Sequence, residues 1–243
     1  MKLNNGFELI LSPNKSAKSI NIGLYFYGGS AGERIYESGI HHLLEHMFFR
    51  RLSDMSQPKL YSALNRIGAT MRGATYLNFL RFDITVSPKH LKAALNIILK
   101  FFSEFSWSEQ EVQSEQEVVL NQIYFSGGNS FYQNVQKEYL SRTGFEHPIM
   151  GNESSVKRIS AERLNQLKKE IVSPQNAVVV VTGNVSEENC EYITRSLSSI
   201  EKTAGSIKEP ICTLPGTFLK RSDRSIDIFS ADDDISEIIF SFD

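Results

Sequence analysis

The chain has 243 residues, a formal net charge of −2 at pH 7 and 41% hydrophobic residues, which is ordinary for a globular protein with a sizeable core. The nearly balanced charge excludes the basic surface of a nucleic-acid-binding protein. No apolar run approaches the ~20 residues that a membrane-spanning helix needs, so we expect neither nucleic acid nor a membrane as a partner. Cys190 and Cys212 are widely spaced, and the N-terminus lacks the apolar centre of a secretion signal; both features predict a reduced, cytoplasmic protein.

Hydrophobic periodicity predicts strands and helices along the whole chain. Apolar residues that recur every second position indicate a strand, and those that recur every third or fourth position indicate a helix. In chain order, these patterns predict strands over residues 7–11 and 19–27, helices over 38–51 and 58–67, strands over 70–71 and 79–86, helices over 88–105 and from 106 or 108 to about 127, a helix over 160–171, a strand over 176–182 and a helix over 186–199. The chain therefore contains both kinds of element throughout.

Composition predicts three segments. Residues 1–205 hold the regular pattern of strands and helices, and we expect them to form one domain. Residues 206–224 contain Gly, Pro, Ser and Lys, which is typical of a linker. Residues 225–243 contain two further apolar runs, which we interpret as the first strands of a second, incomplete domain.

The most informative stretch is His42-Leu-Leu-Glu45-His46. On a helix, positions 42 and 46 lie one turn apart on the same face, so two imidazoles can converge on one metal ion. Zinc binds histidine readily, and catalytic zinc sites use three protein ligands and leave one position for water. Glu45 lies beside the same point, where a carboxylate can take a proton from that water. The spacing is that of the inverzincin signature.

A short motif of this kind can also occur without any function. A histidine pair beside a glutamate is often a solvated helix face. The context favours a metal site, because an apolar strand and a Gly-Gly-Ser turn precede the helix and Met47, Phe48 and Phe49 would anchor it in a core. His41 points about 100° away from His42 on a helix, so we expect it behind the ligands or at the surface.

The motif lies within a longer resemblance. The chain resembles the pitrilysin-type zinc metallopeptidases, the family of insulin-degrading enzyme and mitochondrial processing peptidase. In one order, the matching segments are residues 5–10, the strand-to-helix entry from Gly29 to Glu33 with Gly39, the motif itself, residues 115–120, residues 151–159 and the strand over 178–184. Matches in one order over some 180 residues are far more specific than the motif alone.

The resemblance implies a fold and a way of binding substrate. The fold is an α/β roll, a mostly antiparallel sheet packed against helices, which forms one domain of a clamshell around a peptide chamber. The peptide substrate is held there as an added strand on a sheet edge, which in this chain would lie near residues 73–79. The family's second half supplies a substrate-gripping Arg and Tyr that match nothing here, so we expect a homologous second half or a partner subunit.

The resemblance also assigns roles at the site. It makes His42 and His46 zinc ligands and Glu45 the catalytic base, with Glu115 as a second catalytic-site residue behind the ligands. The family's third zinc ligand is a glutamate seven residues after the position of Glu115, and this chain has Gln122 there. An amide oxygen is a neutral and weaker ligand than a carboxylate.

Three explanations of Gln122 stay open. The glutamine is native in a weakly metallated member, it is an introduced change that disables the site, or Glu115 or Glu117 rotates in as a substitute ligand. The sequence thus predicts a zinc-dependent endopeptidase in which Glu45 activates water. The alternative is a non-catalytic or inactivated subunit that binds peptide or a catalytic partner.

Overall fold

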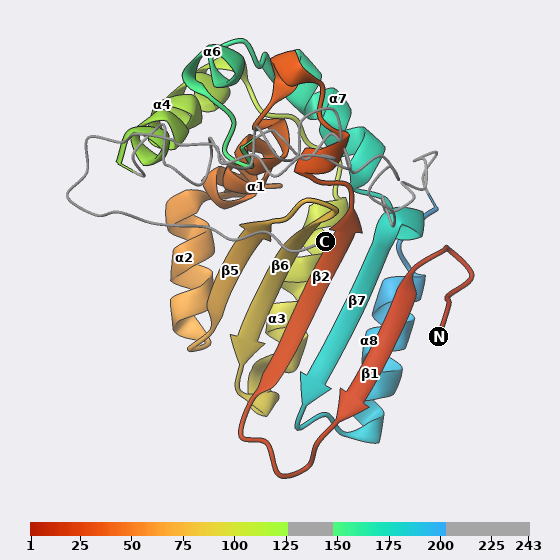
Figure 1. Cartoon of the computed structure of the whole chain (residues 1–243). Helices are drawn as coiled ribbons and strands as arrows, with labels where there is room; N and C mark the ends of the chain where they lie inside the picture. The colour runs from red at the N-terminus through yellow and green to blue at the C-terminus, as the bar shows by residue number, and fades with distance from the viewer. Residues whose placement is uncertain (126–147, 203–243) are drawn as a thin grey trace, which may run out of the picture.

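The computed structural model describes residues 1–125 and 148–202. In these ranges a sheet of five strands, in the order β1-β7-β2-β6-β5, forms the framework (Figure 1). The strands are β1 (Glu8–Pro13), β2 (Ile20–Tyr27), β5 (Thr70–Thr75), β6 (Phe79–Val86) and β7 (Ala177–Gly183). β1 and β7 run parallel, whereas β2 pairs antiparallel with both β7 and β6, and β5 pairs antiparallel with β6. The predicted fold class, a mostly antiparallel sheet with helices, is confirmed.

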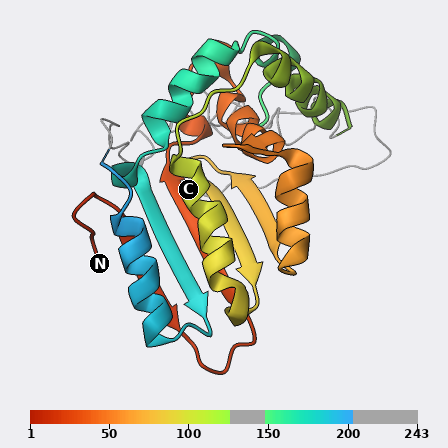
Figure 2. The ribbon, with the colours of Figure 1, turned by 180° about the vertical axis from the view of Figure 1, so that it is seen from behind.

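Helices cover one face of this sheet and cap one end of it. The helices are α1 (Ile40–Arg50), α2 (Gln57–Arg66), α3 (Leu91–Leu99), α4 (Glu109–Phe125), α6 (Glu153–Val156), α7 (Ala161–Ile171) and α8 (Glu187–Ser198). α3 and α8 lie side by side behind the sheet, while α1, α4, α6 and α7 gather beyond one end of its strands (Figure 2). A short hairpin, β3 (Arg51–Leu52) with β4 (Met55–Ser56), joins α1 to α2.

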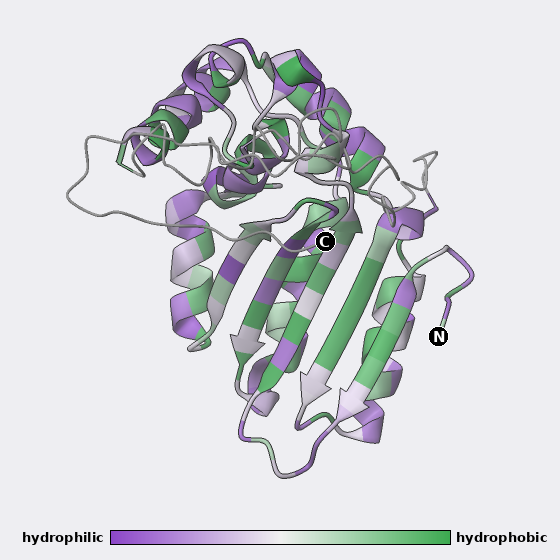
Figure 3. Ribbon diagram, viewed as in Figure 1, coloured by the Kyte–Doolittle hydropathy of each residue, from purple (hydrophilic) through white to green (hydrophobic). Residues whose placement is uncertain are grey.

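The strand pattern divides the sheet into a covered and an open face. Every second residue of β6, beginning with Leu80 and Phe82, is fully buried under the helices. The alternate residues, such as Arg81 and Asp83, face the other way and are only partly buried. Val178 and Val180 of β7 and Ile10 of β1, which is 46% exposed, make part of this open face apolar, and β7 is coloured as hydrophobic over most of its length in Figure 3. The core therefore lies between the sheet and the helices.

Two predicted elements have different bounds in the structure. The strand expected at residues 70–71 continues to Thr75, since pairing of Thr75 with Leu80 of β6 outweighs the weak strand preference of Gly73 and Ala74. The helix expected over residues 88–105 is α3 flanked by two short 3₁₀ turns, and it ends at Phe102. The second turn brings Phe102 to 4.9 Å from Phe7 in an edge-to-face contact that a continuing helix would not provide.

The remaining expectations in the described ranges hold within one to three residues. Ser108, and not Ser106, begins α4: its Oγ accepts from the Glu111 N–H, and Glu111 accepts from the Ser108 N–H. The predicted linker at 206–224 and the strands at 225–243 lie outside the described residues. Among the helices of the described ranges, none is long and apolar enough to cross a membrane.

Candidate metal centre

Helix α1 presents the histidine pair from a buried position. Leu43, Leu44, Met47 and Phe48 are fully buried and anchor the helix against the sheet. The opposite face carries His42 and His46, whose ring centroids lie 4.7 Å apart. Side chains four residues apart on a helix are neighbours, so the predicted convergence of the two imidazoles is what the backbone dictates.

A buried carboxylate organises the N-terminus of α1. Gly39 precedes the helix with φ +90°, and its N–H donates to Glu33 Oε2 (2.7 Å). The N–H and the Nδ1 of His41 both donate to Glu33 Oε1 (2.9 Å each). An anion at this end is stabilised by the unpaired N–H groups and the helix dipole. His41 is thus buried and bound to Glu33, so its alternative placement at the surface was wrong.

Helix α4 brings two side chains to the histidines. Gln122 Oε1 lies 3.1 Å from His42 Nε2, and His46 Nδ1 donates to Glu115 Oε1 (2.9 Å). Arg50 Nη1 lies 3.9 Å from the other Glu115 oxygen. By binding Nδ1, Glu115 sets the tautomer and orientation of the His46 ring and leaves Nε2 available.

Strand β5 holds the carboxylate of Glu45 from the other side. Thr75 Oγ1 donates to Glu45 Oε2 (2.7 Å). A Cβ on Gly73 would lie 2.5 Å from Glu45 Oε1 and 2.7 Å from the Phe49 ring, so only glycine permits this close approach. The carboxylate of Glu45 is therefore pressed against the backbone of an edge strand.

Burial sets the protonation of both groups. Loss of solvent, followed by the charge of His46, lowers the pKa of His42 to about 4, so His42 is neutral near pH 7. Loss of solvent also raises the pKa of Glu45, and the Thr75 hydrogen bond opposes this change. A neutral imidazole is the form that binds metal, and a carboxylate of raised pKa is a better proton acceptor.

The donor set is compatible with zinc. Zinc ligands at 2.0–2.2 Å in a tetrahedron lie roughly 3.3 Å from one another, and the 3.1 Å between His42 Nε2 and Gln122 Oε1 is close to that spacing. Within the described ranges, no group of three or more His, Cys, Asp or Glu side chains has the geometry to hold a metal. A metal ion bound by the histidine pair would therefore take its third donor from the amide oxygen of Gln122.

The two glutamates considered as substitute ligands lie in different places. The side chain of Glu115 is only 9% exposed, and its carboxylate already binds His46 Nδ1. Glu117 is exposed, and its charge acts on Lys157 at α6. In this arrangement Gln122, and neither glutamate, faces His42.

Sequence comparison places this geometry in a family. The model of the insulinase family (peptidase family M16) matches residues 9–154, which include every residue of the candidate centre. The chain belongs to this family. A second model, the peptidase M16 inactive domain, matches residues 158–242.

Several of the matched relatives are named as zinc proteases, and others are named as subunits of larger enzymes. The uncharacterized zinc protease YmxG of Bacillus subtilis is 26% identical over 200 residues, which are 81% of this chain and 49% of the relative. The probable mitochondrial-processing peptidase subunit beta of Arabidopsis thaliana is 23% identical over 231 residues, 93% of this chain and 43% of the relative. The chain thus spans about half the length of these curated relatives.

A solved structure shows the same fold. A protease from Helicobacter pylori superposes with a TM-score of 0.77 at 19% identity, over 86% of this chain and 52% of that one. At this identity, the likeness establishes the architecture of one half of an M16 protein. The α/β roll implied by the sequence resemblance is confirmed.

Two contacts at the site were not foreseen from the sequence. Glu33 was seen only as part of the entry to the helix, and Thr75 only as part of a sheet edge. A buried carboxylate that caps a helix from six residues upstream has no local periodicity to reveal it. Thr75 reaches Glu45 across 30 residues of chain, so only the packing of β5 on α1 joins them.

Proposed function

We propose that this chain is the zinc-binding half of a peptidase that hydrolyses peptides held on the edge of its sheet. One observation carries the proposal: His42, His46 and Gln122 converge beside Glu45, and Glu45 in turn lies against the edge strand β5. The match to zinc proteases over most of the chain supports this reaction class.

Each side chain has a distinct task in this proposal. His42, His46 and Gln122 would hold the zinc, which when bound supplies Lewis acidity toward the peptide carbonyl and water. Glu45 takes a proton from the attacking water while the water oxygen forms a bond to the carbonyl carbon. As the C–N bond breaks, Glu45 passes this proton to the leaving amine. Thr75 fixes one oxygen of Glu45, and Glu115 orients His46.

The edge of β5 is suited to bind a peptide strand. Among the described strands, β5 is last in the sheet order, with a neighbour on one side only. The Tyr76 N–H donates to Phe79 O, and in an antiparallel ladder the residues that bond to the neighbour alternate with those that point outward. The N–H and C=O groups of Met71, Gly73 and Thr75 therefore face outward, where an added strand would pair with them.

A non-catalytic subunit is the second candidate, and Gln122 favours it. A neutral amide in place of a carboxylate weakens the hold on zinc and removes one negative charge from the site. In this second proposal, the chain binds a peptide or a catalytic partner and does not hydrolyse peptides itself. Against it, Glu45 and its partner Thr75 have no evident task without catalysis.

We also propose that the chain works with a homologous second half or partner subunit. The chain matches only about half of each curated relative, and the curated relatives include a subunit of a mitochondrial processing peptidase. A cytoplasmic location remains a prediction from the cysteine usage.

Zinc content and peptide cleavage test the proposal together. Elemental analysis after dialysis should find about one zinc per chain, and none after His46→Ala. Glu45→Gln should keep the zinc and lower cleavage of a fluorogenic peptide mixture by about 10²-fold or more. Retained zinc without cleavage by the wild-type chain, alone or with a homologous second half, would favour the non-catalytic candidate. Absence of zinc, restored by Gln122→Glu, would identify the third ligand as the defect.

A further inference from the structure

Arg72 lies in the middle of the edge strand, next to the residue that touches the catalytic carboxylate. Its neighbour Gly73 faces the helices and Glu45, so the Arg72 side chain emerges on the open face of the sheet. Arg72 is exposed, and it pairs across the strands with Asp83 of β6. A guanidinium is thus displayed one residue from the site of the proposed reaction.

The open face gives Arg72 little compensating charge. Asp83, its cross-strand neighbour, forms an ion pair with Arg81 instead (Nε to Oδ1, 2.8 Å). Arg81 also lies near the Tyr76 ring, with its Cζ 6.0 Å from the centroid. Among the described residues, Arg72 itself forms no ion pair. Two arginines against one aspartate leave this stretch of the edge with a local charge of about +1.

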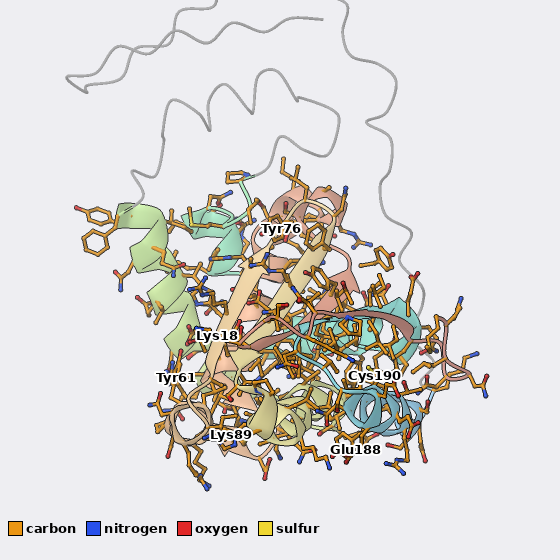
Figure 4. The ribbon with its side chains drawn as sticks, turned by 90° about the horizontal axis from the view of Figure 1, so that it is seen from below. Lys18, Tyr61, Tyr76, Lys89, Glu188 and Cys190 are labelled. Atoms are coloured by element: carbon orange, nitrogen blue, oxygen red, sulfur yellow. The ribbon has the colours of Figure 1, made fainter. Side chains whose placement is uncertain are left out.

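An added strand would bring its own side chains beside Arg72. Tyr76 follows Arg72 by four residues, an even number, so both side chains point to the same face of the strand. Tyr76 lies on the side of the sheet away from α3 and α8 (Figure 4). Paired residues of neighbouring strands place their side chains on the same face, with Cβ atoms about 4.5–5.5 Å apart. Whichever side chain of the peptide pairs with Arg72 therefore meets the guanidinium on the open face. Opposite charges at such positions attract, and like charges repel.

We propose that Arg72 makes this edge selective for peptides with an acidic side chain within about two residues of the cleaved bond. The inference rests on the proposed function, because it needs a peptide on β5. It adds to that function the substrate class, which no part of the zinc site determines. Arg72 acts here on specificity and takes no part in the chemical step.

A binding experiment tests this selectivity apart from turnover. The Glu45→Gln chain is titrated, in the presence of zinc, with fluorescent decapeptide libraries in which Glu, Gln or Lys is fixed at each position in turn. At one or two positions, Glu should bind about two- to fivefold more tightly than Gln, as expected for an exposed ion pair, and Lys more weakly. The preference should shrink in 0.5 M salt because exposed charges are screened.

Two variants decide the origin of any preference. Arg72→Glu should reverse it at the same positions, so that Lys is favoured. Arg195→Glu makes the same charge change on the exposed side of α8, at the other side of the sheet, and should leave the preference as it was. Equal binding of Glu and Lys at every position, or a preference unchanged in Arg72→Glu, would overturn the inference while peptide binding stands. Failure of every library to bind would overturn the peptide-binding proposal as well.

Discussion

At the scale of single residues, the candidate centre is defined by what contacts each imidazole. His42 faces the neutral amide of Gln122, and His46 faces the carboxylate of Glu115. The two contacts differ in kind: Gln122 places an amide oxygen beside His42 Nε2, whereas Glu115 binds His46 Nδ1 and leaves Nε2 of that ring available for the proposed metal. A carboxylate behind a histidine ligand raises its basicity and fixes its ring.

Glu115→Gln should weaken zinc binding by about 10- to 100-fold, the usual cost of losing a partner of this kind. The physical reason is that His46 loses a charged acceptor at Nδ1. Competition with a chromophoric chelator measures the affinity. Glu117→Gln makes the same change at an exposed position of the same helix and should bind zinc like the wild type. Equal losses in both variants would mean that the helix, and not the His46 contact, was damaged.

Gln122→Glu should strengthen zinc binding by about tenfold or more, which corresponds to at least 1.4 kcal/mol. A carboxylate adds a negative charge at the third donor position, and charged acceptors bind cations more strongly than neutral ones. The same chelator competition reports the change. An unchanged affinity would show that residue 122 does not bind the metal, despite its 3.1 Å contact with His42.

At the scale of elements, the close packing of β5 on α1 couples the edge of the sheet to the metal centre. Gly73 allows the strand backbone to lie against Glu45, and Thr75 binds the same carboxylate two residues later. A peptide that pairs with β5 would therefore lie next to the proposed base without any movement of the chain.

Gly73→Ala should break this packing and destabilise the fold by about 1–3 kcal/mol, as overpacked sites do. The new Cβ would meet Glu45 Oε1 at 2.5 Å, so the strand or the carboxylate has to move. Denaturant unfolding measures the loss, and a peptide-binding assay detects displacement of the edge. Gly32→Ala is the control, because a Cβ there meets nothing within 4 Å. A Gly73→Ala chain as stable as Gly32→Ala would contradict the tight contact.

At the scale of the whole molecule, residues far apart in the sequence hold α4 in place. Lys168 of α7 donates to the Phe105 carbonyl, and its Nζ lies 3.4 Å from the centroid of the Phe105 ring. Arg51, the first residue of β3, donates to the Ser106 carbonyl and to Glu111 Oε1. These contacts fasten the segment that leads into α4, and α4 carries both Glu115 and Gln122.

The buried amine of Lys168 should give the fold a characteristic pH dependence. Burial, followed by the charges of Arg51 and Lys169, lowers the pKa of Lys168 to about 8 from an ordinary value of 10.5. Between these values the unfolded chain binds more protons than the folded one, so stability rises with pH. Below pH 8 the charged amine imposes its full cost on the folded state.

The free energy of unfolding should therefore increase from pH 8 to 10.5 in the wild type relative to Lys168→Met. Denaturant titrations at several pH values measure this difference. Lys15→Met removes an exposed lysine from the turn between β1 and β2 and should follow the wild type over this range. Parallel curves for the wild type and Lys168→Met would show that the amine is not desolvated in the folded chain.

The sequence by itself determined the local features of this protein. The spacing of His42, Glu45 and His46 predicted one helix face, and the family resemblance predicted Gln122, seven residues after Glu115, at the position of the third metal ligand. Most of the longer strands and helices of the described ranges followed from their periodicity. β5 and α3 took their bounds from β6 and Phe7, and the short elements β3, β4 and α6 were not predicted. Such features depend on residues close together in the chain, and their spacing can be seen directly in the sequence.

Only the tertiary structure decided how these pieces meet. It brought α4 against α1, so that Gln122 faces His42 across 80 residues of chain, and it placed Thr75 on Glu45. It also buried His41 on Glu33 and left Arg72 exposed beside Gly73, the residue that contacts Glu45. These contacts arise from packing a sheet against helices, where burial and close approach join residues that no sequence spacing relates.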